Sequence, residues 1–515
     1  MLGTSNFEYV LIRTSITLIR AVTPLSICYC IARPFLTYLP RLRFLPILDV
    51  WAASETIFYV LVYRPWRYRL QRRAAHPPLV PREERRTLFR RCQENIPDPE
   101  RYLSKWFLQA PVAEIKRENL KEFYRWAFLN TGECYAVDDD ELEEYVASFE
   151  AVLGRRLEPG RGKAECLRLS LDKVKMVHRP LIWFLTVFAV DNYTHFHLLY
   201  HKFQYHRTKL RPYPTVFPFR PQTLLTTRRS PVPDLSYWYR PHKSKTSLPV
   251  VFLHGIGIGL YPYVPFLAGL NGGSKSSADD DGDVGIIAIE ILPVSFRMTG
   301  PALGRHEMCQ QIQTILLRHG FEKFVLVPHS YGSVITTHLL KDPEISPQIA
   351  SVILIDPVTI LLHLPDVAYN FTCRNPGQAN EWQLWYFAST DMCVAHTLFR
   401  CFFWSENILW LEDFQDRKIS VFLSGRDLIV NSEQVGRYLT KGRADGARAD
   451  EQSESDERSS WKTEPKGWTA PPTGIKVFWG EELDHAQIFD SKSRRDILIG
   501  EVHEHSEQGR ISVDI

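Results

Sequence analysis

Three hydrophobic patterns follow one another along the chain. The first 75 residues are dominated by two long apolar runs, at 21–39 and 44–63. A middle part then carries apolar side chains at the three- and four-residue spacing of amphipathic helices. From about residue 234, short β-branched runs alternate with helical stretches. The pattern predicts an N-terminal apolar segment at 1–75, a helical domain at 76–233 and an α/β domain at 234–515.

The N-terminal segment has the features of a membrane anchor. The run at 44–63 is long enough to cross a hydrocarbon core of ~30 Å, and a basic-aromatic cluster typical of the cytoplasmic interface follows it. That cluster comprises Arg64, Trp66, Arg67, Tyr68, Arg69, Arg72 and Arg73. Asp49 and Glu55 count against a simple crossing, because an acid at mid-membrane costs ~2.5–3.5 kcal/mol on insertion scales. One crossing, two crossings and a hairpin in one leaflet stay open, and the alternative is a set of soluble helices that cover the catalytic domain.

The middle region is expected to be mainly helical. Residues 114–129 place Leu120 and Phe123 on one helical face, and residues 138–153 begin with aspartates, which suit a helix N-terminus. Residues 180–190 are apolar all round but too short to span a bilayer. They predict a buried helix or one that dips into the membrane.

The last part predicts a doubly wound, mostly parallel sheet. Six continuous apolar runs of strand length are expected to be buried on both faces. They lie at 250–253, 286–289, 324–327, 352–355, 419–423 and 475–478. The stretches at 271–285 and 441–472 are rich in small or charged residues and predict flexible surface loops.

The candidate nucleophile is Ser330. Residues 324–333 read Phe-Val-Leu-Val-Pro-His-Ser-Tyr-Gly-Ser, a buried strand that runs into a serine and then a helix. Such a turn holds the serine on strained backbone and demands small residues two positions before and after it. Gly332 meets the second demand, whereas Pro328 occupies the place where glycine is usual.

An earlier loop is the candidate oxyanion hole. Residues 253–257, Leu-His-Gly-Ile-Gly, follow a strand, and the backbone N–H groups of Ile256 and Tyr331 are the expected donors. Gly255 and Gly257 allow close approach of the backbone, so with His254 they are candidates for substrate binding. His254 is equally a candidate for structural support of the loop.

Two more strand ends supply the remaining candidates. Asp427 ends the strand that starts near 419, and His485 follows the strand near 475. We expect His485 to be the base and Asp427 the acid that orients it. Asp356 and Asp484 are the alternatives for the acid, although Asp356-Pro357 favours a strand end followed by a cap.

These four ordered motifs resemble the α/β-hydrolase superfamily over residues 234–505. More narrowly, residues 290–297 and 356–371 resemble membrane-bound α/β-hydrolases of fungi and other lower eukaryotes. The resemblance implies the α/β-hydrolase fold with a cap insertion, here at 361–414, a segment dense in aromatic side chains. In addition to this fold and its cap, we expect an N-terminal helical extension that associates with a membrane.

Composition narrows the function classes. The 62 basic and 59 acidic residues nearly balance, at a net charge of +3, which argues against a nucleic-acid-binding protein. Nine scattered cysteines without a CxxC pair indicate reduced thiols in a cytosol-facing protein. His306-Glu307 lacks the second histidine of a zinc helix, and His197 with His201 is more typical of an aromatic-rich helix than of a metal site. We expect no metal and no cofactor.

The sequence therefore predicts a membrane-associated serine hydrolase that cleaves a lipid-like or acyl ester through an acyl-enzyme. An acyltransferase would use the same residues. A non-catalytic membrane scaffold that retains the fold is the alternative from another class, and Pro328 favours it. An epoxide hydrolase or dehalogenase would need an acid where Ser330 stands.

Overall fold

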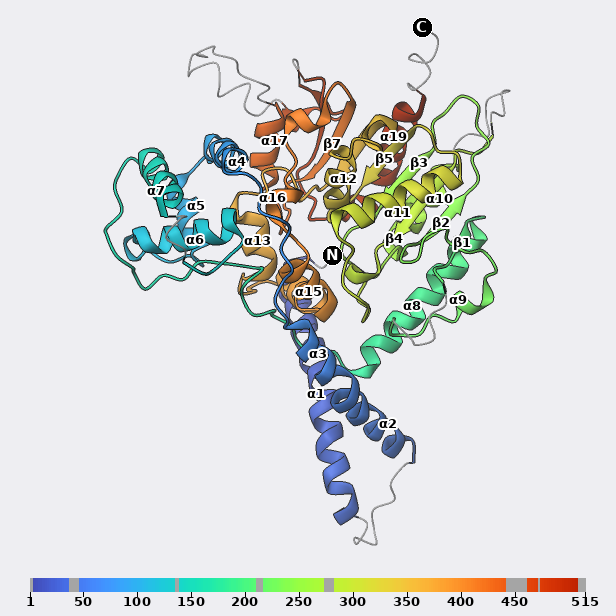
Figure 1. The fold of residues 1–515 in the computed structure, drawn as a ribbon. Helices are drawn as coiled ribbons and strands as arrows, with labels where there is room; N and C mark the ends of the chain where they lie inside the picture. The colour runs from blue at the N-terminus through green and yellow to red at the C-terminus, as the bar shows by residue number, and fades with distance from the viewer. Residues whose placement is uncertain are drawn as a thin grey trace.

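A single mixed sheet forms the centre of the computed structural model, which describes residues 3–36, 46–134, 139–209, 216–272, 282–440, 461–470 and 473–507 (Figure 1). The sheet has nine strands in the order β1-β2-β4-β3-β5-β6-β7-β9-β8. Their bounds are β1 Gln204–His206, β2 Ser236–Arg240, β3 Val250–Leu253, β4 Ile286–Glu290, β5 Phe324–Pro328, β6 Ile349–Ile355, β7 Lys418–Ser424, β8 Trp468–Thr469 and β9 Lys476–Gly480.

The six predicted strands are the parallel core of this sheet. β4, β3, β5, β6, β7 and β9 pair in parallel, whereas β1, β2 and β8 pair antiparallel at the two edges. β3, β4 and β5 are buried at every residue, as continuous apolar strands between two helical layers must be. The predicted fold class is confirmed, and β1 extends the sheet into the range that the pattern assigned to the helical domain.

Helices cover both faces of the sheet. α10 (Val264–Gly269) and α19 (Lys492–Glu507) pack in one hydrophobic cluster with Val250 and Phe252. On the other face, α11 (Arg305–Arg318), α12 (Gly332–Leu340) and α17 (Ser432–Thr440) pack with Val251 and Leu253. The alternation of neighbouring strand residues between the two clusters is the doubly wound arrangement.

The helical region lies on two sides of the sheet (Figure 1). α4 (Arg82–Glu94), α5 (Pro99–Trp106), α6 (Arg117–Leu129) and α7 (Asp139–Leu153) lie beside the cap, whereas α8 (Leu181–Tyr200) and the short α9 (Gln222–Leu225) lie near β1. Between β6 and β7, the cap segment forms α13 (Pro365–Thr372), α14 (Ala379–Leu384), α15 (Met392–Arg400) and α16 (Trp404–Asn407). α8 is longer than the predicted apolar run, because Asp191 inside it is buried and paired with Arg220 and Arg297.

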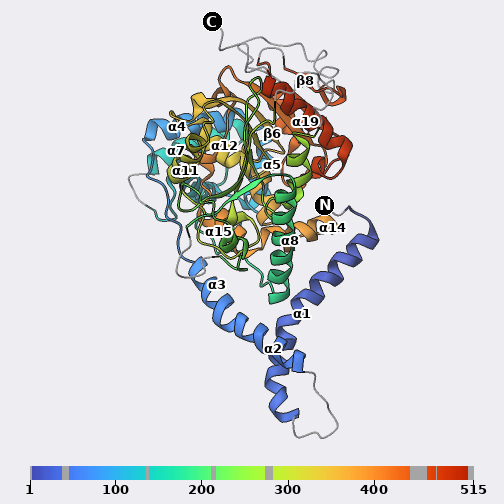
Figure 2. The same cartoon turned by 90° about the vertical axis from the view of Figure 1, so that its right-hand side faces the viewer.

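The N-terminal segment forms a bent helical hairpin that projects from the body (Figures 1 and 2). It consists of α1 (Asn6–Leu36), α2 (Pro46–Ile57), the π-helical turn Phe58–Tyr63 and α3 (Arg64–Leu70). Asn6–Phe35 and Pro46–Leu70 are long and apolar enough to cross a membrane by length and composition. α1 begins before the predicted run, since Ile12 and Ile16 pack against the cap and Arg13 lies 3.9 Å from the ring of Trp382.

The two predicted loops fall largely outside the described residues, at 273–281, 441–460 and 471–472. The part of the second loop that is described differs from the prediction. Trp461 is 2 % exposed, its ring meets that of Trp479 edge-on at 5.1 Å, and β8 pairs with β9. The many charged residues around Trp461 led to the prediction of a flexible loop. The buried side chain of Trp461 nevertheless packs this stretch against the sheet.

Candidate active site

Ser330 occupies a strained turn between β5 and α12. Its φ is +50°, in the left-handed region that a non-glycine residue rarely adopts. A Cβ at Gly332 would lie 2.3 Å from the backbone oxygen of Leu253, so only glycine fits there. The turn tolerates Pro328, because the N–H groups that follow it, of His329 and Ser330, donate to Leu253 O and Ile355 O at 2.9 Å each.

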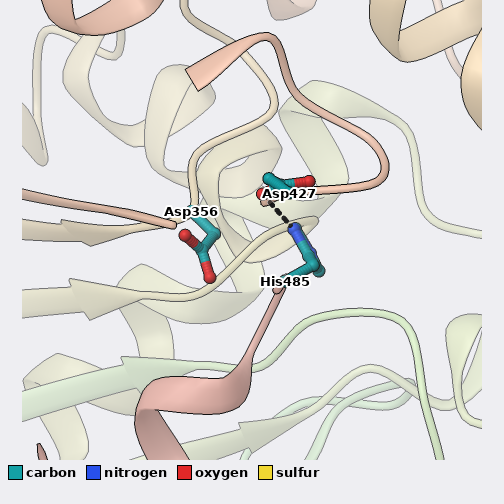
Figure 3. Close-up of side chains that lie close together, drawn as sticks. All are labelled: Asp356, Asp427 and His485. Atoms are coloured by element: carbon teal, nitrogen blue, oxygen red, sulfur yellow. Dashed lines mark hydrogen bonds and ion pairs between the residues drawn. The ribbon is translucent and has the colours of Figure 1, made fainter. Parts of the chain in front are cut away.

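The structure brings Ser330, His485 and Asp427 together. His485 Nε2 lies 2.8 Å from Ser330 Oγ. Figure 3 shows the other contact of the ring, in which His485 Nδ1 lies 2.7 Å from Asp427 Oδ2. The other carboxylate oxygen of Asp427 accepts from the N–H groups of Ile429 at 2.7 Å and Val430 at 2.9 Å. The acid is thus held rigidly, and the histidine is oriented to receive a proton from the serine hydroxyl.

The two alternative acids are close but hydrogen-bonded elsewhere. Asp356 Oδ1 accepts from Ser424 N–H at 3.0 Å, and its Oδ2 accepts from Ala486 N–H at 2.9 Å. Asp484 accepts from the N–H of His485 itself at 2.7 Å. Both therefore anchor the backbone around His485, whereas the carboxylate of Asp427 contacts its ring.

These acids determine the electrostatics of the imidazole. Burial disfavours the imidazolium form, but the negative charge of Asp427, helped by Asp356 and Asp484, outweighs it and raises the pKa of His485 to about 9. Burial, together with the neighbouring Asp427, raises the pKa of Asp356 to about 6. The site is therefore built to stabilise a positive charge on His485, which forms when the ring takes a proton.

The loop after β3 packs against the turn that carries Ser330. A Cβ at Gly255 would lie 2.8 Å from Ser330 Cβ, and the N–H of Gly257 donates to Val294 O at 3.1 Å. Within the described parts of the chain, the N–H groups of Ile256 and Tyr331 have no hydrogen-bond acceptor. Both residues line the same cavity as Ser330, so these two donors are available to a bound oxygen.

His254 supports this loop from inside. It is fully buried, with Nδ1 2.8 Å from Gly255 O and Nε2 accepting from the N–H of Ile291 at 2.9 Å. Because both ring nitrogens are engaged, the residue is placed to hold the loop rather than to touch a substrate. Burial lowers the pKa of His254 to about 4, so it stays neutral.

A narrow apolar cavity opens beside Ser330. The cap contributes Val367, Ala368, Phe371, Thr372, Leu398, Phe402 and Trp404, and the helical region contributes Trp106, Trp126 and Leu169. The helical region had not been expected at the site. No local motif marks these tryptophans, since contacts such as Trp106 Nε1 donating to His363 O at 3.3 Å join distant parts of the chain.

The same residues form a possible metal-binding cluster. Asp356, Asp427 and His485 offer ligand atoms within 4.8 Å of one another, the one such group of three among the described residues. Each carboxylate already accepts backbone N–H bonds, and both nitrogens of His485 have protein partners. The fold itself therefore satisfies these donor atoms.

Comparisons with known proteins find distant structural similarity only. No family model matches the chain, and no curated protein matches it. A bacterial membrane phospholipase A structure shares 11% identity, covers 62% of this chain and 93% of its own, at a TM-score of 0.34. An esterase from Rhodococcus sp. ECU1013 shares 15% sequence identity. The match covers 52% of this chain and 94% of the esterase, at a TM-score of 0.33. A lipase described as putative, from Acinetobacter baumannii AYE, shares 11% sequence identity. The match covers 60% of this chain and 93% of the lipase, at a TM-score of 0.36.

Similarity at these identities and scores is too distant to indicate a shared activity. The α/β-hydrolase fold is evident from this chain itself, in the parallel sheet and in the serine turn at the end of β5. The narrower resemblance to fungal membrane-bound members stays a prediction.

Proposed function

We propose that this protein is a membrane-associated serine hydrolase that cleaves carboxylic esters, with Ser330 as nucleophile, His485 as base and Asp427 as the orienting acid. The observation that carries the proposal is the hydrogen-bonded chain Ser330 Oγ–His485–Asp427, with contacts of 2.8 and 2.7 Å. The strained φ of +50° at Ser330 supports it, because such strain persists where it exposes a reacting group.

The mechanism follows from these contacts. His485 Nε2 takes the proton of Ser330 Oγ as that oxygen attacks the ester carbonyl carbon, and the N–H groups of Ile256 and Tyr331 stabilise the oxyanion. The imidazolium then protonates the leaving alkoxide, and the alcohol departs from an acyl-enzyme. His485 next takes a proton from water, the hydroxide attacks the acyl carbon, and the protonated ring returns its proton to Ser330. The products are an alcohol and a carboxylic acid.

The cavity favours an apolar acyl group. Its walls are mainly aromatic and aliphatic, and Ser330 lies among its lining residues. Burying apolar surface of a chain there is favourable by ~25 cal/mol per Å². With the apolar hairpin at the N-terminus, a lipid-like or acyl ester is the substrate class that the chain supports best.

A fluorophosphonate probe tests the proposal directly, since it reacts only with an activated serine. The full chain should be labelled, and Ser330→Ala should abolish the labelling. Ser493→Ala, an exposed serine at the start of α19, is the matched control and should label like the wild type. A folded wild-type chain that takes no label would contradict the proposal and favour the non-catalytic scaffold.

A further inference from the structure

Helix α8 presents an apolar stripe to the outside, with large side chains in its first and last parts and the small Ala189 between them. One face carries the buried residues Phe184, Val187, Asp191, Thr194, His195 and Leu198. The other is exposed at helical spacing and holds Ile182 (42 % exposed), Leu185 (45 %), Tyr193 (58 %), Phe196 (64 %), Leu199 (44 %) and Tyr200 (81 %). A stripe of this length on a surface helix marks an interaction surface, because single exposed apolar residues are ordinary whereas contiguous patches are not.

The N-terminus of α8 meets the candidate membrane helices at one point. Leu181 N–H donates to Glu55 Oε2 at 2.7 Å, and Glu55 Oε1 accepts from the hydroxyl of Thr23 at 2.5 Å. α1, α2 and α8 therefore join at a single buried junction. Figure 2 shows α8 descending to this junction between the upper part of α1 and α3.

The part of the hairpin beyond this junction is too short to cross a bilayer. From Pro24 to Leu36, α1 extends about 20 Å at 1.5 Å per residue, whereas the hydrocarbon core is ~30 Å thick. The candidate span runs from Asn6 to Phe35, and its first part packs against the cap through Ile12 and Ile16; the length that remains after Ile19 still runs past the junction. A bilayer that covers most of that length also covers the first turns of α8.

The stripe changes character along the helix in the way that a membrane interface requires. Near the junction its large side chains are the aliphatic Ile182 and Leu185, and farther away they are mainly the aromatic Tyr193, Phe196 and Tyr200. Tyrosine and other aromatic rings are favoured at the headgroup level, aliphatic chains below it. Tyr193 lies about 18 Å along α8 from Leu181.

The neighbouring arm of the hairpin reaches the headgroup level at a comparable height. Arg64, Arg67 and Arg69 are exposed on α3, which starts about 13 Å along the helix from Glu55. Arginines at this depth interact favourably with anionic headgroups. The aromatic residues of α8 and the arginines of α3 thus lie on two sides of the junction, and both are suited to the same membrane–water interface.

We propose that the exposed face of α8 is embedded in one leaflet of a lipid bilayer, with Ile182 and Leu185 among the acyl chains and Tyr193, Phe196 and Tyr200 at the headgroup level. This inference rests on the membrane association in the proposed function. It makes α8 a second membrane contact beside the hairpin, which holds the catalytic domain against the lipid surface rather than on a loose tether.

Photo-crosslinking of the full chain tests this. p-Benzoylphenylalanine is introduced at Leu185 or Phe196, and the protein is reconstituted in vesicles of phosphatidylcholine and phosphatidylserine. Irradiation should give lipid adducts, found by mass spectrometry, at both positions. Leu317 on α11, 67 % exposed, is the matched control and should give none. Leu25, 65 % exposed on the projecting part of α1, reports insertion of the hairpin itself.

The outcomes distinguish the role of α8 from the membrane association of the hairpin. Adducts at Leu25 without adducts at Leu185 and Phe196 would overturn the role of α8 while leaving the hairpin anchor. Crosslinks from Phe196 to a second protein chain would overturn it in favour of a dimer surface. No lipid adduct at any position, Leu25 included, would refute the membrane association on which the inference depends.

Discussion

Replacement of Asp427 by asparagine should nearly abolish activity while keeping the fold. Asp427 Oδ1 accepts two backbone N–H bonds, from Ile429 and Val430, so an asparagine at this position must keep its oxygen there. Its NH₂ group then faces His485 Nδ1, where the carboxylate had accepted a hydrogen bond of 2.7 Å. The ring would be forced to carry its proton on Nε2, which cannot then receive the proton of Ser330.

The size of the effect follows from the lost charge. Two opposite charges about 4 Å apart at an effective dielectric constant of about 20 attract by about 4 kcal/mol. At about 1.4 kcal/mol per decade of rate, the loss of this attraction alone slows the reaction by about three powers of ten. With the wrong tautomer, a fall of ~10³–10⁴ in kcat is expected.

Asp356→Asn is the matched comparison, because this acid is also buried within the same cluster. Both its oxygens accept backbone N–H groups, so asparagine loses one bond at a stability cost of ~1–3 kcal/mol. Activity should fall by ~10-fold at most, since the contact of Asp427 with the ring remains. The assays are the rate constant of fluorophosphonate labelling and hydrolysis of a p-nitrophenyl ester. Loss of labelling in Asp356→Asn with retention in Asp427→Asn would reverse the assignment of the acid.

Three further predictions use other parts of the site. The labelling rate should rise with pH through a pKa above 6.5, since the acids raise the pKa of His485 and only the neutral ring can act as base; a plateau already reached below pH 6 would contradict this. Gly332→Ala should lower the free energy of unfolding by ~2–3 kcal/mol, because its Cβ would meet Leu253 O at 2.3 Å, whereas Gly300→Ala has no atom within 4 Å and should be neutral in urea unfolding. Ala368→Phe should fill the apolar cavity and reduce kcat/KM for long-chain esters far more than for acetates, and an equal loss for both would argue against an acyl pocket.

The parallel core of the fold was predictable because each of its strands is a continuous apolar run. β1 and β8 were not predicted, since an edge strand needs no such run, and β2, which lies between β1 and β4, was missed because its residues are not a continuous aliphatic run. β2 reads Ser-Tyr-Trp-Tyr-Arg and β8 consists of Trp468–Thr469. Their pairing is determined by neighbours distant in the sequence, which a local pattern does not contain.

The convergence of the candidate residues has a topological cause. Ser330, Asp427 and His485 each follow a strand of one parallel sheet, and the carboxyl ends of such strands meet at the same edge. Order along the chain therefore predicted proximity. The cavity wall could not be predicted in this way, because Trp106 and Trp126 come from helices whose position depends on contacts with distant parts of the chain.

One buried charge network links α8 to the loop after β3. Asp191 on α8 pairs with Arg220 and Arg297, and Arg220 also pairs with Glu290 at the end of β4. The next residue, Ile291, donates to His254, which supports the loop of Ile256. Breaking a buried ion pair of this kind costs ~3–5 kcal/mol. The network therefore prevents α8 from moving independently of β4. The proposed lipid contact of α8 and the proposed oxyanion hole are therefore both connected to the carboxyl end of β4.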